Sequence, residues 1–296
     1  MNAVLTLIAG PDAELPRGVV ADVRDALSAL GVDSGVPDWL APGRACDLPF
    51  QGSPDQADAA ARRVLAGAAV DVVAQGAEGR RKRLLIADME STVIRQELLD
   101  ELGALAGLGE RIAAITHRAM NGEIDFKASL RERMELLAGL PDSALEAVEA
   151  RIEPMPGALA LVRTMRGRGA WCILVSGGFR RFTRRVAALC GFDDEIGNEP
   201  ELVDGRLTGR LDEPVLDADS KAERLVRTVV ARRIPIRASL AVGDGANDLP
   251  MLEIAGLGLA FHARPAVAAR ARNRLDHADL TGALYAQGYR LEEIIA

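Results

Sequence analysis

Cysteine is scarce in this sequence, and the shortage limits the possible class of protein. Only three cysteines occur among the 296 residues, at positions 46, 172 and 190. Their spacing matches neither a zinc motif nor a disulfide framework. Cys172 falls within the apolar run at 171–175 and is interpreted as a core residue. The sequence therefore argues against a disulfide-stabilised fold and against a cysteine-based metal site.

Long apolar runs and an excess of basic residues are also missing. No stretch of about 18 apolar residues occurs, and the first residues do not form a basic, apolar signal segment. We therefore expect a cytoplasmic protein with no membrane partner. The 36 basic and 43 acidic residues give a net charge of −7, which argues against nucleic acid as a partner. The densest basic group, residues 80–83, is interpreted as a solvated linker.

Short apolar runs and amphipathic stretches alternate along the chain, which predicts an α/β protein. In the first part of the chain, strands are predicted at 4–9 and 70–73, and helices at 19–30 and 55–66. This part contains no cluster of catalytic residue types. We expect residues 1–78 to form a small α+β domain with a regulatory or a purely structural role.

The rest of the chain is expected to form a core that a helical segment interrupts. Core strands are predicted at 84–87, 171–175, 239–242 and 257–261, core helices at 179–190, 219–233 and 264–273, and a hairpin turn at 204–207. Between them, residues 95–150 show only helical periodicity. An insertion after the first core strand would cover the carboxyl edge of the sheet as a lid. The predicted core therefore comprises residues 79–94 and 151–296, and the cap comprises residues 95–150.

Acidic side chains follow two of the predicted strands. Asp88 and Glu90 come directly after the strand at 84–87, and Asp244 and Asp248 follow the strand at 239–242. Open α/β sheets bind ligands at the carboxyl ends of their strands. Carboxylate oxygens suit Mg²⁺, and an aspartate can attack a phosphoryl group to form an aspartyl-phosphate. Glycine–aspartate turns are common, but two such clusters suggest one metal-assisted site for an anionic substrate.

Two further segments offer groups that can hold a phosphoryl group. Ser176, Gly177 and Gly178 follow a strand and precede a predicted helix, where a hydroxyl and backbone N–H groups can cradle an anion. Lys221 stands at the start of the helix at 219–233, where an ammonium group can hold a phosphoryl oxygen. Taken singly, the serine is better explained as a helix N-cap and the lysine as a solvated residue.

The order of these four elements resembles the haloacid dehalogenase superfamily over residues 84 to about 280, and residues 243–248 (Gly-Asp-Gly-Ala-Asn-Asp) carry the most specific motif. The resemblance implies a doubly wound parallel-sheet core, a cap and a magnesium-dependent site. It makes Asp88 the nucleophile and residue 90 the general acid and base, with its backbone carbonyl on magnesium. The remaining implied roles are phosphoryl binding by Ser176, Gly177 and Lys221, magnesium binding by Asp244, and support of that site by Asn247 and Asp248.

Two longer segments narrow the resemblance to the phosphoserine phosphatase family. They are residues 88–97 (Asp-Met-Glu-Ser-Thr-Val-Ile-Arg-Gln-Glu) and residues 119–126 with the following 129–133. The resemblance implies that Glu97 faces the ammonium group of the substrate and that Arg133 binds its carboxylate. Met120 and Phe126 match residues that close the pocket. The implied partner is a small molecule, O-phospho-L-serine, and a homodimer through the N-terminal domain is a further possibility.

One position departs from the family pattern, because Glu90 stands where an aspartate is usual. The extra methylene moves the carboxylate, and misplacement by about 1 Å can cost on the order of 100-fold in rate. Three functions stay open: a phosphatase that forms serine in the last step of its biosynthesis, a phosphotransferase to an alcohol such as homoserine, and a non-catalytic serine or phosphoserine sensor. We favour the phosphatase, since the other site positions fit it.

Overall fold

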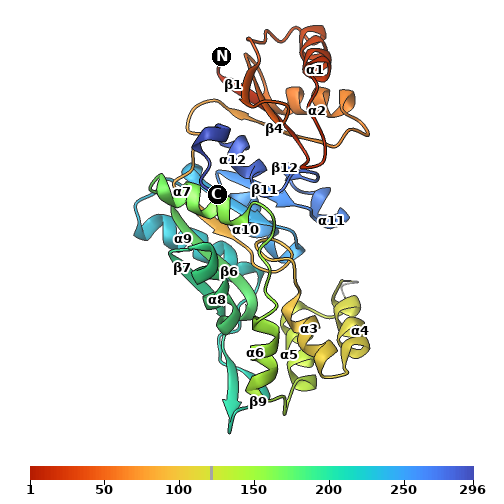
Figure 1. Ribbon diagram of the computed structural model, residues 1–296, viewed down its shortest axis with the longest axis vertical. Coiled ribbons are helices and arrows are strands. Elements are labelled where there is room, and N and C mark those ends of the chain that lie inside the picture. Colours follow the sequence, from red (N-terminus) through yellow and green to blue (C-terminus); the bar gives the residue numbers. More distant parts are fainter. Residues whose placement is uncertain (121–122) are drawn as a thin grey trace.

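The computed structural model describes residues 1–120 and 123–296, without the side chain of Met120. Figure 1 shows an elongated molecule with an N-terminal sheet at one end, a larger sheet in the middle and a group of helices at the other end. Among the described residues, no helix combines the length and the apolar character that crossing a membrane requires.

The N-terminal region is a four-stranded antiparallel sheet with two helices. The strands are β1 (Ala3–Ala9), β2 (Asp38–Ala41), β3 (Ala45–Phe50) and β4 (Val70–Gly76), in the spatial order β2-β3-β1-β4. The helices are α1 (Arg17–Ala29) and α2 (Pro54–Val64), and both bury apolar residues with the sheet. The two predicted helices and the strands at both ends of this region are confirmed. Strands β2 and β3 were not predicted. In β3, Asp47 and Pro49 interrupt the apolar pattern.

The central sheet has six parallel strands and confirms the predicted doubly wound α/β core. The strands are β5 (Leu84–Ala87), β6 (Trp171–Phe179), β7 (Asp194–Asn198), β10 (Ser239–Gly243), β11 (Leu257–Phe261) and β12 (Asn273–Leu275). Their spatial order is β12-β11-β10-β5-β6-β7. Residues of β5 are fully buried, as expected for a parallel strand with helices on both faces of the sheet.

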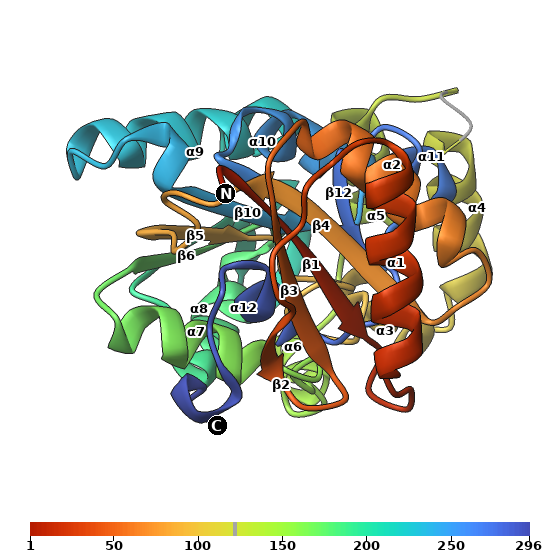
Figure 2. The ribbon, with the colours of Figure 1, turned by 90° about the horizontal axis from the view of Figure 1, so that it is seen from above.

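Alternate residues of β5 pack against different helix layers. Leu85 and Ala87 share a cluster with residues of α7 (Ala158–Gly167) and α8 (Arg180–Cys190). Leu84 and Ile86 share another with residues of α9 (Ala218–Ala231) and α10 (Leu249–Ile254). Figure 2 shows these two layers on opposite sides of the sheet. This alternation is why an unbroken apolar run forms the central strand.

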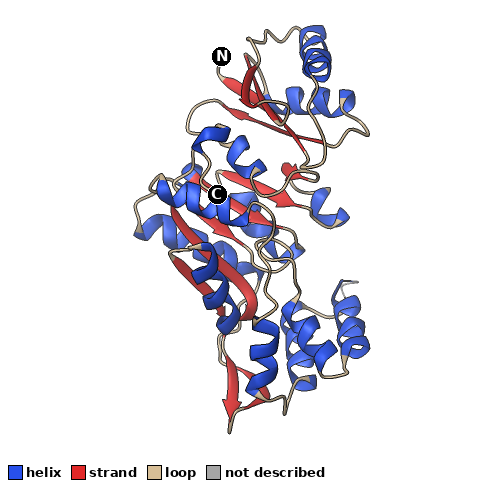
Figure 3. Cartoon of the chain, in the orientation of Figure 1, coloured by secondary structure: helices blue, strands red, loops and turns tan. Residues whose placement is uncertain are grey.

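The insertion after β5 is helical, as predicted. It contains α3 (Leu98–Leu105), α4 (Gly109–Met120), α5 (Phe126–Leu136) and α6 (Asp142–Glu149). The predicted hairpin is formed by β8 (Pro200–Val203) and β9 (Arg206–Leu211), and β9 packs against α5. Figure 3 shows these four helices and the hairpin grouped at one end of the molecule, below the central sheet.

Strand β7 and helix α7 were not predicted, and two of the predicted core segments differ in the structure. The predicted helix at 264–273 is a short helix, α11 (Pro265–Ala268), followed by strand β12. The strand predicted at 171–175 continues to Phe179, so the Ser176 segment ends a strand, and α8 begins only at Arg180. Both differences arise from pairing with neighbouring strands, since β12 pairs with β11 and Phe179 with Asn198 of β7.

The basic segment at 80–83 links the two sheets, as predicted, but it is only partly solvated, since Arg81 and Arg83 are exposed whereas Arg80 and Lys82 are not. The Arg80 guanidinium donates to both carboxylate oxygens of Asp47, at 2.6 and 3.0 Å, and to the Thr6 hydroxyl. Lys82 is buried, and its ammonium group donates to the carbonyls of Gly79 and Arg237. Most of these partners, Asp47, Thr6 and Arg237 among them, are distant in sequence, so a composition argument does not reveal them.

Candidate active site

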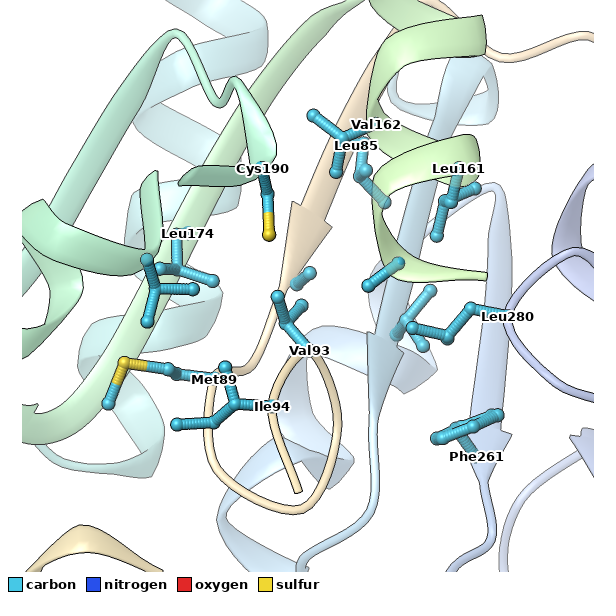
Figure 4. Close-up of a cluster of buried hydrophobic side chains, with 14 of the residues drawn as sticks. Leu85, Met89, Val93, Ile94, Leu161, Val162, Leu174, Cys190, Phe261 and Leu280 are labelled. Atoms are coloured by element: carbon cyan, nitrogen blue, oxygen red, sulfur yellow. The ribbon is translucent and has the colours of Figure 1, made fainter. Parts of the chain in front are cut away.

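The segment after β5 turns polar groups toward one side and apolar groups toward the core. Met89, Val93 and Ile94 are buried and point into the cluster that contains Leu174 and Cys190, as Figure 4 shows. The N–H groups of Val93 and Ile94 both donate to the carbonyl of Met89, at 2.8 and 2.9 Å, which closes a tight turn. The apolar residues thus anchor the turn that carries the acidic side chains.

Asp88 lies against the ammonium group of Lys221. The Lys221 Nζ atom donates to Asp88 Oδ1 at 2.5 Å and to Asp248 Oδ1 at 2.7 Å, and all three side chains are buried. Burial opposes the charge on Lys221, but Asp248 and Asp88 outweigh it and raise the lysine pKa. Burial and the nearby Asp248 charge raise the pKa of Asp88, while Lys221 opposes that rise. A buried lysine thus joins the two acidic clusters.

Asp88, Asp244 and Asp248 form a compact set of carboxylates. One oxygen from each lies within 4.8 Å of the others. The Thr92 hydroxyl donates to Asp244 at 3.3 Å, and the Gly245 N–H donates to Asp248 at 3.0 Å. Burial and repulsion from Asp248 raise the pKa of Asp244 to about 7. Three carboxylates beside one ammonium group leave excess negative charge, and a hard divalent cation fits that oxygen-rich site.

The Ser176 segment lies beside this set and meets the cap. Ser176 is buried, and its Oγ atom accepts a hydrogen bond from the Gly178 N–H at 2.9 Å. A Cβ atom at Gly177 would lie 2.6 Å from Cζ of Phe126, so the first residue of α5 packs directly on this glycine. A Cβ atom at Gly178 would lie 3.2 Å from Oε2 of Glu90. Both glycines therefore permit close approach by site residues.

Glu90 reaches from the core to the cap. Its Oε1 atom accepts a hydrogen bond of 2.7 Å from the N–H of Leu98, the first residue of α3. Burial and the charge of Glu97 raise the pKa of Glu90 to about 8, and Arg133 opposes the rise. Glu97 in turn accepts a hydrogen bond of 2.8 Å from the Ser91 hydroxyl. Charges of both signs from the cap thus act on the carboxylate of Glu90.

The structure brings most of the predicted site residues to the carboxyl edge of the central sheet. The side chain of Asn247 turns back toward Gly245, where an added Cβ atom would lie 2.3 Å from the Asn247 Oδ1 atom. Met120 ends α4, and its side chain lies outside the described part of the chain. Two residues without a predicted role also take part: Thr92, which stands in the Asp88 motif, and Asn198, which no sequence motif marks.

Comparisons with known proteins agree with this site. Residues 85–253 match the family model of haloacid dehalogenase-like hydrolases. Over 289 residues the chain is 39% identical to phosphoserine phosphatase SerB2 of Mycobacterium tuberculosis, covering 95% of the chain and 71% of that relative. A phosphoserine phosphatase of Streptomyces coelicolor is 41% identical over 230 residues, which are 78% of this chain but only 56% of the relative.

A solved structure extends the likeness to the N-terminal sheet. The unliganded probable phosphoserine phosphatase of Vibrio cholerae superposes with a TM-score of 0.79 at 30% identity, covering 99% of this chain and 88% of the other. Together with the strand-end acidic clusters, these likenesses establish a phosphatase enzyme. The chain belongs to the phosphoserine phosphatase family within the haloacid dehalogenase-like hydrolases.

Proposed function

We propose that this chain hydrolyses O-phospho-L-serine to L-serine and phosphate, the last step of serine biosynthesis. One observation carries the proposal: the Asp88–Lys221 pair shares a site with Glu90, whose carboxylate experiences the charges of Glu97 and Arg133. A phosphorylated amino acid has three charged groups, and this site offers a partner for each. The names of the relatives support the same substrate.

The phosphoryl group is transferred to Asp88 in the first step. One carboxylate oxygen of Asp88 attacks phosphorus in line with the serine oxygen, the new O–P bond forms, and the bond from phosphorus to the serine oxygen breaks. Lys221 and the Ser176 hydroxyl, together with backbone N–H groups near Gly177, neutralise the phosphoryl oxygens. Such preorganised charge is commonly the largest catalytic contribution in phosphoryl transfer.

A magnesium ion would be held by Asp88, Asp244 and the backbone carbonyl of Glu90, with Asp248 and Asn247 supporting that arrangement. When bound, the ion supplies positive charge that offsets repulsion between the attacking carboxylate and the phosphoryl oxygens. The fit rests on the excess negative charge among the three buried carboxylates and on the raised pKa of Asp88 and Asp244.

Glu90 moves the protons in both steps. In the first step the protonated carboxyl group donates its proton to the departing serine oxygen. In the second step the carboxylate takes a proton from water, which attacks phosphorus and releases phosphate from Asp88. Because burial raises the pKa of Glu90 to about 8, the protonated form is available near neutral pH. Glu90 therefore suits both roles despite its extra methylene.

The cap recognises the amino acid end of the substrate. Glu97 pairs with the substrate ammonium group, and Arg133 binds its carboxylate, for which a guanidinium offers a planar fork. Phe126 closes the pocket above the Ser176 segment. We further propose that residues 1–78 form a regulatory-like domain, residues 79–94 and 151–296 the catalytic core and residues 95–150 the cap, and that the N-terminal domain carries a homodimer contact.

The decisive experiment measures phosphate release from O-phospho-L-serine, with magnesium and with a chelator, beside an Asp88→Asn variant. We expect release that requires magnesium and disappears in the variant. Absence of release from the wild-type protein, with phosphoserine binding intact by calorimetry, would overturn the proposal in favour of a sensor. Asp88→Asn keeps the shape of the side chain, so its loss of activity would report on the nucleophile and not on folding.

A further inference from the structure

Asn198 lies at the end of β7 and is 2% exposed, yet both polar atoms of its side chain are used. Its Nδ2 atom donates to the carbonyl of Gly177 at 2.7 Å. Its Oδ1 atom accepts a hydrogen bond from the N–H of Leu216 at 2.8 Å. A buried amide whose two polar groups are both hydrogen-bonded fixes the separation of its two partners. Breaking either hydrogen bond would leave a buried polar group without a partner, which is costly.

The two partners belong to the two segments that hold the phosphoryl group. Gly177 directly follows Ser176. Leu216 directly precedes Asp217, whose carboxylate caps α9 by accepting from the Ser220 N–H at 2.9 Å. Lys221 is the next residue of that helix and reaches Asp88. One side chain therefore spans from the serine segment to the start of the lysine helix, on a strand that contributes no group to the reaction.

The cap meets the same two segments. Phe126, the first residue of α5, packs on Gly177, and the next residue, Lys127, forms an ion pair with Asp217 at 2.8 Å. Gly177, Asn198, Asp217 and the start of α5 thus form a closed ring of contacts. Asn198 sets the spacing between the two segments that the cap must fit when it closes.

We propose that Asn198 is a positioning residue that holds the Ser176 segment and the Lys221 helix at the separation a phosphoryl group requires. It does not contact the substrate and acts through Gly177 and Leu216. Loss of its amide lets the two segments move apart, and misplacement by about 1 Å can cost on the order of 100-fold in rate. The inference rests on the proposed function only in assigning both segments to phosphoryl binding.

The test compares Asn198→Ala and the milder Asn198→Ser with the wild-type protein, all in full-length form with magnesium. Neither replacement side chain can span both partners. The readouts are the affinity for inorganic phosphate by calorimetry, inhibition by L-serine, kcat on phosphoserine, and Tm. Asn273→Ala is the control, because Asn273 is also buried and contacts one carbonyl, that of Gly258, at the start of β12.

We expect both Asn198 variants to bind phosphate at least about tenfold more weakly and to lose about 10–100-fold in kcat, with L-serine inhibition within about twofold. The control variant, Asn273→Ala, should have a lower Tm but an unchanged phosphate affinity, L-serine inhibition and kcat. Folded Asn198 variants with phosphate affinity within about twofold of wild type would overturn the inference. A wild-type protein that binds phosphate but hydrolyses no phosphoserine would instead overturn the proposed function, and the phosphate comparison would still decide the role of Asn198.

Discussion

The carboxylate of Glu90 accepts a hydrogen bond of 2.7 Å from the N–H of Leu98, which links the catalytic turn to the first residue of cap helix α3. The N–H groups of a helix's first turn have no partner within the helix, so a carboxylate there is stabilised. An aspartate at this position would be shorter by one C–C bond, about 1.5 Å. The longer side chain of Glu90 therefore connects the group proposed to transfer protons with the first residue of the cap helix.

Glu90→Asp should accordingly reduce activity. The shorter carboxylate would retract from Leu98 and leave that N–H without its partner, so we expect kcat to fall by about tenfold or more. Glu90→Gln keeps the length of the side chain but cannot exchange the proton, so its kcat should be lower still. Steady-state kinetics on phosphoserine measures both. A tenfold gain for the aspartate variant would mean that the pocket is not adapted to glutamate.

Gly177→Ala should disturb the contact between core and cap. The added Cβ atom would lie 2.6 Å from Phe126, so the ring must move from the Ser176 segment. We expect kcat/KM for phosphoserine to fall by about tenfold, as displaced closing groups typically cost. Phe126→Leu in the same chain should restore part of the loss by making room. If the double variant is as impaired as Gly177→Ala, the steric explanation is wrong.

Local sequence patterns predicted most residues of the candidate site but few of the contacts that hold those residues in place. Asp88, Ser176 and Asp244 follow apolar runs, and a parallel sheet gathers the ends of such runs at one edge. Asn198 and Arg80 act through partners distant in sequence, Gly177 and Asp47, so no local pattern marks them.

The missed strands have the same physical origin. Strand β12 contains only three residues, Asn273, Arg274 and Leu275, and none of its local features favours a strand. It is a strand because β11 offers a parallel edge to pair with. Tertiary pairing therefore overrides propensity here, as it commonly does for short strands.

Arg133→Ala should affect substrate recognition far more than the phosphoryl chemistry. Removing a charge-assisted contact to the substrate carboxylate costs about 1.5–3 kcal/mol, so KM for phosphoserine should rise by about tenfold or more. Hydrolysis of p-nitrophenyl phosphate, which has no amino acid end, should change by less than about threefold. Glu97→Gln serves as the matched variant for the ammonium group. Equal losses on both substrates would contradict the assigned role of Arg133.

Arg80→Ala should destabilise the protein through the junction of the two sheets. Asp47 is buried, and Arg80 is its charge partner through two hydrogen bonds. Removing one member of a buried ion pair typically costs about 3–5 kcal/mol because the other charge is left uncompensated. Urea unfolding of the full chain measures the loss. Arg80→Ala combined with Asp47→Asn should lose less than the sum of the single variants, and strict additivity would argue against this pairing.

Asp217→Asn should reduce stability in a pH-dependent way. Hydrogen bonds from Lys127 and then Ser220 lower the pKa of Asp217 to about 2. An acid whose pKa is depressed in the folded protein contributes stability above its unfolded value, about 3.9, and that contribution is lost as the pH falls toward the folded value. The variant keeps an N-cap oxygen but loses the charge that faces Lys127 and the N-terminus of α9, so it should be less stable by about 1 kcal/mol or less at pH 7.

The difference in Tm between wild type and Asp217→Asn should stay constant between pH 7 and about 5 and narrow below about pH 4. Lys127→Met, which removes the ion pair but leaves the cap contact with Ser220, should show a smaller difference over the same range. Asp217 links the cap, through Lys127, to the helix that carries Lys221. A variant that loses the stability contributed by Asp217 should therefore also lose activity. A difference that widens as the pH falls would show that the aspartate is not stabilised by Lys127 and Ser220 in the folded protein.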